Sequence, residues 1–101
     1  MTLWLWLLLL AMGPAPRRHT VEIRGMEFRP AELTVAVGDT VVWMNRDLVP
    51  HTATGTGKTK WDTALLAPGD SGRYVATVAG NVSYVCAFHP TMRGKLLVLD
   101  D

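Results

Sequence analysis

The chain has a single cysteine, almost no net charge and no visible internal repeat. Because Cys86 stands alone among 101 residues, an intramolecular disulfide is excluded, and the thiol has to be buried, reactive or bound to a metal. Ten basic and nine acidic residues are interspersed and give a net charge of +1, which offers no electrostatic case for a nucleic acid or an acidic partner. The length allows one domain with a single core.

The first dozen residues are apolar but too few for a membrane-spanning helix. Leu3 to Met12 is almost wholly apolar, whereas a spanning helix needs about 20 such residues. The run fits the apolar region of a signal peptide, and small residues just beyond it supply a cleavage pattern. No Lys or Arg precedes it, and cleavage would leave Pro16 first, so an uncleaved anchor stays open. We therefore expect residues 1–15 to be a signal peptide or anchor, residues 16–101 to be the folded domain, and the protein to be exported to the periplasm or elsewhere outside the cytoplasm.

Beyond this segment, the sequence is typical of short β-strands separated by turns. Six segments carry the pattern of a strand: 19–23, 33–37, 40–45, 74–78, 82–86 and 95–99. The segment 40–45 is apolar on both faces, as in a central strand, and 79–81 looks like a hairpin-like break. Short strands with turn signals about every 8–12 residues, and no helix of useful length, predict a β-sandwich or barrel.

A loop near the C-terminus carries three side chains that bind metals. Cys86, His89 and Met92 lie within seven residues, directly after a predicted strand, and His51 follows another apolar segment far upstream. Thiolate and thioether select copper, and two His with one Cys and a weak axial Met form the ligand set of blue-copper electron-transfer sites. The four residues therefore predict a site for one copper ion that cycles between Cu(I) and Cu(II).

Other interpretations of these residues fit less well. A lone Cys is often only a small buried hydrophobe. Structural zinc usually takes further Cys or His ligands, and a thioether is a poor zinc ligand. A hydrolytic Cys gains from a helix N-terminus or a nearby cation, whereas Cys86 ends a strand. Oxidase or nitrite-reductase chemistry would need a second copper with extra histidines, so we do not expect an enzyme. A copper carrier or buffering protein without an electron-transfer role stays open.

With these residues placed, the chain resembles the cupredoxins, the small blue-copper proteins that include plastocyanin and amicyanin. The resemblance covers about residues 19 to 100. It rests on four motifs: MEFRP at 26–30, VGDTVVWMN at 37–45, PHT at 50–52 and YVCAFHPTMRGK at 84–95. Only two residues separate His89 from Met92, a short spacing that looks like amicyanin. Amicyanins usually carry Pro at the position of Phe88 and an aromatic residue at that of Thr91, so the docking surface of this chain can differ.

The resemblance implies a Greek-key β-sandwich and one copper ion held by His51, Cys86, His89 and a weaker axial Met92. It also implies that Asn45 stiffens the site by hydrogen bonds between the two ligand-bearing segments. The implied function is to carry single electrons between a redox protein donor and an acceptor outside the cytoplasm. We expect a monomer, with membrane attachment only through the N-terminal segment.

Overall fold

The computed structural model describes residues 15–100, in which all regular secondary structure is β-strand. The strands in chain order are β1 (Arg18–Arg24), β2 (Glu27–Arg29), β3 (Glu32–Ala36), β4 (Thr40–Asn45), β5 (Thr54–Gly55), β6 (Ser71–Val75), β7 (Gly80–Val85) and β8 (Arg93–Leu99). Within the described residues, no helix is long and apolar enough to cross a membrane. The signal peptide or anchor predicted for residues 1–15 falls almost wholly on residues 1–14, which lie outside this range, and stays a prediction.

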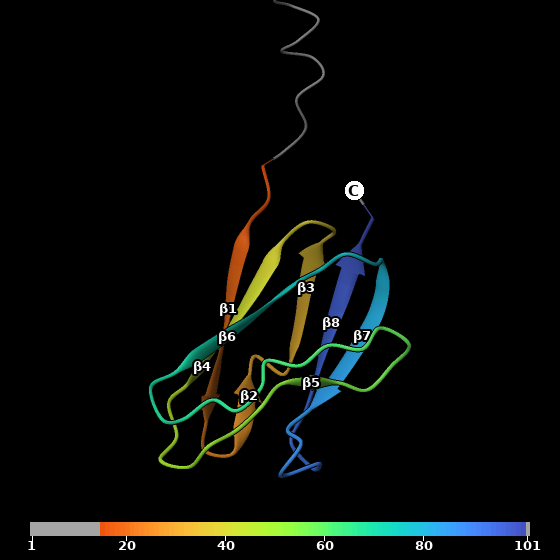
Figure 1. The fold of residues 1–101 in the computed structure, drawn as a ribbon. Coiled ribbons are helices and arrows are strands. Elements are labelled where there is room, and N and C mark those ends of the chain that lie inside the picture. Colours follow the sequence, from red (N-terminus) through yellow and green to blue (C-terminus); the bar gives the residue numbers. More distant parts are fainter. Residues whose placement is uncertain (1–14, 101) are drawn as a thin grey trace, which may run out of the picture.

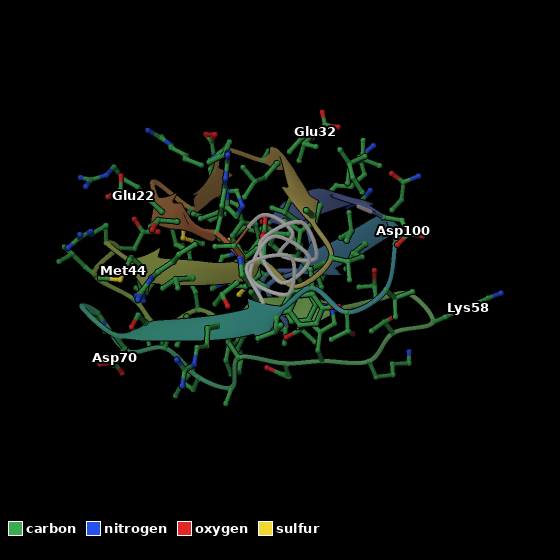
Figure 2. All side chains as sticks on the ribbon, turned by 90° about the horizontal axis from the view of Figure 1, so that it is seen from above. Glu22, Glu32, Met44, Lys58, Asp70 and Asp100 are labelled. Atoms are coloured by element: carbon green, nitrogen blue, oxygen red, sulfur yellow. The ribbon has the colours of Figure 1, made fainter. Side chains whose placement is uncertain are left out.

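The strands form two four-stranded sheets that pack around one core (Figure 1). Their orders are β2-β1-β4-β6 and β3-β8-β7-β5. β1 runs parallel to β4 and β3 runs parallel to β8, while the other neighbouring strands are antiparallel. This arrangement confirms the predicted all-β Greek-key sandwich. Charged side chains such as those of Glu22, Glu32 and Lys58 lie around its rim (Figure 2).

Aliphatic residues and a cluster of aromatic rings fill the space between the sheets. Strand β4 lies between β1 and β6, and its Trp43 is fully buried, which confirms the central strand predicted for 40–45. The Trp43 ring packs edge-on against Tyr84, with ring centroids 5.2 Å apart, and Trp61 stacks on Tyr74 at 4.3 Å. Burial of these large rings contributes strongly to the hydrophobic driving force for folding.

Two glycines beside Tyr84 leave room for the aromatic rings. Gly94 faces Tyr84 across the β7–β8 pair, and a Cβ atom at Gly94 would overlap the Tyr84 ring. Gly55 faces Tyr84 from β5, and its Cβ would lie 2.5 Å from Nε1 of Trp61. Burial raises the pKa of Tyr84 to about 12, so its phenol stays neutral at physiological pH.

The strand pattern read from the sequence differs from the structure at three places. It does not indicate β2 and β5, because segments of three and two residues show no periodicity. The strand expected at 74–78 is instead Ser71–Val75, since the backbone of Ala76 bonds to the turn between β3 and β4 rather than to β4. The hairpin-like break expected at 79–81 is wrong, because β6 and β7 belong to different sheets and the chain crosses between the sheets there.

The carboxylate of Asp39 closes the end of the sandwich at which β1 begins. It accepts hydrogen bonds from the backbone N–H groups of Arg17, at 2.9 Å, and Ala36, at 3.0 Å. The Nε2 atom of His19 lies 2.8 Å from Oδ2 of the same carboxylate. The Arg17 N–H, the His19 ring and the Ala36 N–H together lower the pKa of Asp39 from 3.8 to about 2. The ionised carboxylate therefore ties the start of β1 to the turn after β3.

We expect Asp39→Asn to lower the stability of the protein at neutral pH, because the amide lacks the charge that these donors favour. The pKa of Asp39 is lower in the folded chain than in the unfolded one, so its stabilisation is present above pH 3.8 and is lost as the pH falls towards about 2. Urea unfolding at a series of pH values measures this, with Asp70→Asn, at a surface turn carboxylate, as the control. If Asp39→Asn lowers the free energy of unfolding by the same amount at neutral pH and near pH 2, the prediction is contradicted.

Candidate metal centre

Two loops at one end of the sandwich carry the predicted metal ligands. Figure 1 shows the loop after β4 and the loop between β7 and β8 at the same end, opposite the start of β1. His51 lies on the first loop, while Cys86, His89 and Met92 lie on the second. Sγ of Cys86 is 3.6 Å from Nδ1 of His51 and 3.7 Å from Nδ1 of His89, and these three donor atoms lie within 4.8 Å of one another. The fold therefore brings His51 to a thiol 35 residues away in the chain.

The β7–β8 loop holds its three candidate ligands with backbone hydrogen bonds of its own. The N–H of His89 bonds to the C=O of Cys86 at 3.1 Å, and the N–H of Met92 bonds to the C=O of His89 at 2.8 Å. The N–H of Cys86 in turn bonds to the C=O of Met92 at 3.1 Å. Cys86 and Met92 are buried, with exposed fractions of 0% and 5%, while His89 is half-buried. The thioether of Met92 thus belongs to the same closed loop as the thiol of Cys86.

The backbone and the ring of His51 are both fixed by neighbours. Its backbone N–H and C=O pair with Leu66 at 3.1 and 2.8 Å. Its ring Nε2 lies 2.9 Å from Oδ2 of Asp47. A proton on Nε2 that is donated to this carboxylate leaves the lone pair of Nδ1 free on the side of the Cys86 sulfur. The His51 side chain is fully buried and that of Asp47 is 13% exposed, so this hydrogen bond is largely shielded from water.

Asp47 is itself held by the tight turn between β1 and β2. Its carboxylate accepts the N–H of Gly25 at 2.6 Å and that of Met26 at 2.9 Å. Burial opposes ionisation of Asp47, but these N–H groups and the His51 ring outweigh it and hold the pKa of Asp47 below its ordinary value. The carboxylate therefore stays ionised near neutral pH and continues to orient His51.

Thr52 joins the two ligand-bearing segments. Its backbone N–H lies 3.5 Å from Sγ of Cys86, and its Oγ1 accepts the N–H of Ala87 at 2.8 Å. The Thr52 hydroxyl also forms a hydrogen bond with the Thr54 hydroxyl, at 2.8 Å. Hydrogen bonding around a ligating sulfur tunes the reduction potential of a copper site. Thr52 therefore links the two segments and places a backbone N–H beside the Cys86 sulfur.

Asn45 stiffens the site in a different way from the one that the resemblance implies. Its side chain bonds to the backbones of Val49, Leu66 and Asp47, each at 2.9 Å. These partners all lie in the chain upstream of the β7–β8 loop. Within the described residues, the contacts that reach that loop come instead from Thr52, which bonds to Cys86 and Ala87, and from the His51 ring, which lies 3.6 Å from the Cys86 sulfur.

Asp47 and Thr52 are the supporting residues that the sequence analysis misses. Both act through contacts with segments that are distant in the chain, at Gly25, Met26 and Ala87. Their positions in the sequence could have indicated these roles. Asp47 lies four residues before His51 and Thr52 directly follows it, and a carboxylate or hydroxyl so placed can support a histidine ligand.

The donor set fits a copper ion. Two imidazole nitrogens and one sulfur converge, and a thioether is buried on the same loop as that sulfur. Soft sulfur ligands combined with imidazole favour copper, and two His, one Cys and a weak axial Met are the arrangement of blue-copper sites. A β-sandwich that carries such a donor set at one end defines the cupredoxin class.

Comparison with known proteins agrees with this class. Residues 17–99 match the model for copper binding proteins of the plastocyanin/azurin family, and the chain belongs to this family. It is 38% identical to amicyanin from Paracoccus denitrificans over 82 residues, which cover 77% of this chain and 63% of that relative. The chain thus spans less than two thirds of the length of this relative.

Solved structures of copper proteins also match this chain. A reduced amicyanin variant matches with a TM-score of 0.75 and 30% identity, over 88% of this chain and 87% of that chain. A copper-containing nitrite reductase from Thermus scotoductus matches with a TM-score of 0.75 and 30% identity, over 90% of this chain but 24% of that enzyme.

We expect Thr52→Val to destabilise the protein by about 0.5–1.5 kcal/mol, because the N–H of Ala87 loses its acceptor. The link between the segments also loosens, so the amide of Ala87 should exchange with solvent faster. Urea unfolding and hydrogen exchange followed by NMR measure the two effects. Thr56→Val is the control, since its hydroxyl bonds to the C=O of Ser83 at the surface and its loss should change stability by less than about 0.5 kcal/mol. Equal effects of the two substitutions would count against a linking role for Thr52.

Proposed function

We propose that this chain is a blue-copper protein that carries single electrons between redox proteins. The observation that supports it is the convergence of Sγ of Cys86 with Nδ1 of His51 and Nδ1 of His89 within 4.8 Å. In this proposal, these three residues bind one copper ion and Met92 is the weaker axial ligand. Bound copper would supply a one-electron couple between Cu(I) and Cu(II).

The surroundings of the donor atoms support this function because they keep the ligands in place. His51 is held by Leu66 and Asp47, and the β7–β8 loop is closed by its own backbone bonds. Groups that are already oriented in a site need little reorganisation when the charge in that site changes. The buried rings of Phe28, Trp43 and Tyr84 also exclude water from the core between the sheets.

An apolar surface at the same end supports docking of a redox partner there. Leu48, Val49 and Phe88 have exposed fractions of 94%, 43% and 62%. Exposed apolar residues that gather in a patch commonly mark an interaction surface. His89 follows Phe88 directly and is the least buried of the proposed ligands, so we propose that electrons pass through the edge of its ring.

We further propose a carrier rather than an enzyme. The nitrite reductase neighbour is matched over 24% of its length, so most of that enzyme lies outside the match. The protein would work as a monomer in the periplasm or elsewhere outside the cytoplasm. The apolar stretch 3–12 would serve as its signal peptide, or as an anchor that supplies any attachment to a membrane.

The visible spectrum of the chain loaded with Cu(II) tests this proposal. We expect an intense blue band from thiolate-to-copper charge transfer, and Cys86→Ser should abolish it because a hydroxyl cannot replace the thiolate. His19→Gln, at the opposite end of the sandwich, is the control and should keep the colour. A colourless Cu(II) complex, or preferential uptake of zinc, would refute the proposal. A blue protein that redox mediators cannot cycle would indicate a copper-buffering role instead.

We expect Met92→Gln to lower the reduction potential while copper stays bound. A weak axial thioether favours Cu(I), and an amide oxygen in its place favours Cu(II). Voltammetry of the two proteins gives the shift, and Met44→Gln, on the outward side of β4, controls for the loss of a methionine elsewhere (Figure 2). An unchanged or raised potential would remove Met92 from the axial position.

A further inference from the structure

Burial of the metal centre raises the question of how copper reaches it. His51 and Cys86 are fully buried and Met92 is 5% exposed, so the surface must offer a path to these ligands. One hollow of about 180 Å³ is lined by Met92 with its two chain neighbours and, on the other side, by Met26 and the first residues of β2. Its lining includes a second methionine, Met26, which is 42% exposed. Two thioether-bearing residues, one exposed and one buried, therefore line a single hollow beside the metal centre.

The backbone of Met26 is unusual for a residue with a long side chain. Its φ angle of 61° lies in the left-handed region, which is unfavourable for residues with a Cβ atom and is normally taken by Gly or Asn. Asp47 fixes this conformation, because its carboxylate accepts the N–H groups of both Gly25 and Met26. The same carboxylate holds the ring of His51 at 2.9 Å. Strained residues often mark functional positions, and this one is tied by a single carboxylate to a proposed copper ligand.

We propose that Met26 is the first contact for Cu(I) during loading of the metal centre, and that it passes the ion across the hollow to Met92. The inference rests on the proposed copper function. The soft thioether of Met26 selects Cu(I) over harder cations. Glu27 and Arg93 line the same hollow with opposite charges, so sulfur rather than net charge sets the selectivity. The transfer is a ligand exchange in which a bond to the delivering ligand breaks as a bond to sulfur forms, and no electron moves.

The rate at which the metal-free chain takes Cu(I) from its bicinchoninate complex tests this proposal. Stopped-flow absorbance of the chelate gives the rate, and the variant is Met26→Leu. This swap conserves volume and keeps the backbone N–H that bonds to Asp47. We expect several-fold slower uptake, with the same final amount of bound copper and the same blue colour after oxidation. Met44→Leu removes a thioether elsewhere on the rim and should load at the wild-type rate (Figure 2).

A second readout follows the Met26 side chain directly. Ag(I) imitates Cu(I) without redox chemistry. Once a first equivalent of Ag(I) occupies the metal centre, we expect a second equivalent to shift the Met26 methyl signal in the NMR spectrum. Equal loading rates for wild type and Met26→Leu, or an unmoved Met26 signal, would overturn the inference. If the wild-type chain takes up copper and turns blue, such a result refutes the loading role of Met26 and leaves the proposed copper function standing. A wild-type chain that takes up no Cu(I) refutes the proposed function as well.

Discussion

The hydrogen bond between the Thr52 hydroxyl and the Ala87 N–H is the contact on which the metal centre depends. It joins two residues that are 35 positions apart in the chain, each two residues away from the Thr54–Val85 pair that links β5 to β7. The N–H of Thr52 reaches the sulfur of Cys86 from the same residue. The bond therefore extends the β5–β7 pairing to the end of the sandwich and helps to set the distance between the donor atoms on the two segments.

Asp47 plays the corresponding role on the other side of His51. One carboxylate organises the turn at Gly25 and Met26 and orients the imidazole, so the conformation of an exposed turn and the direction of a buried ligand are coupled. Its ionisation is favoured by these same donors against the cost of burial. A site of this kind is stiff without a large number of interactions, because each supporting group contacts two parts of the site at once.

The sequence predicts those features that are encoded locally. The alternating or β-branched segments lead to β1, β3, β4, β7 and β8 with small errors at their ends, and Cys86, His89 and Met92 are close enough in the chain to be recognised together. The short strands β2 and β5 carry too few residues for a period, and β6 is displaced because the backbone of Ala76 bonds to a turn instead of a strand. The supporting roles of Asp47 and Thr52 are not predicted for a similar reason, since their hydrogen-bond partners are determined by the fold and not by spacing in the sequence.

The metal centre and the start of β1 lie at opposite ends of the sandwich, as Figure 1 shows. Asp39 clamps the chain at Arg17 just before β1, so the point of attachment is stiff as well as distant from the ligand loops. A linker placed ahead of Arg17 would hold the domain on an electrode or a carrier with its ligand loops directed outward. Immobilisation through the opposite end would instead place the half-buried ring of His89 against the support, where it would face an electrode directly but be closed to a soluble partner.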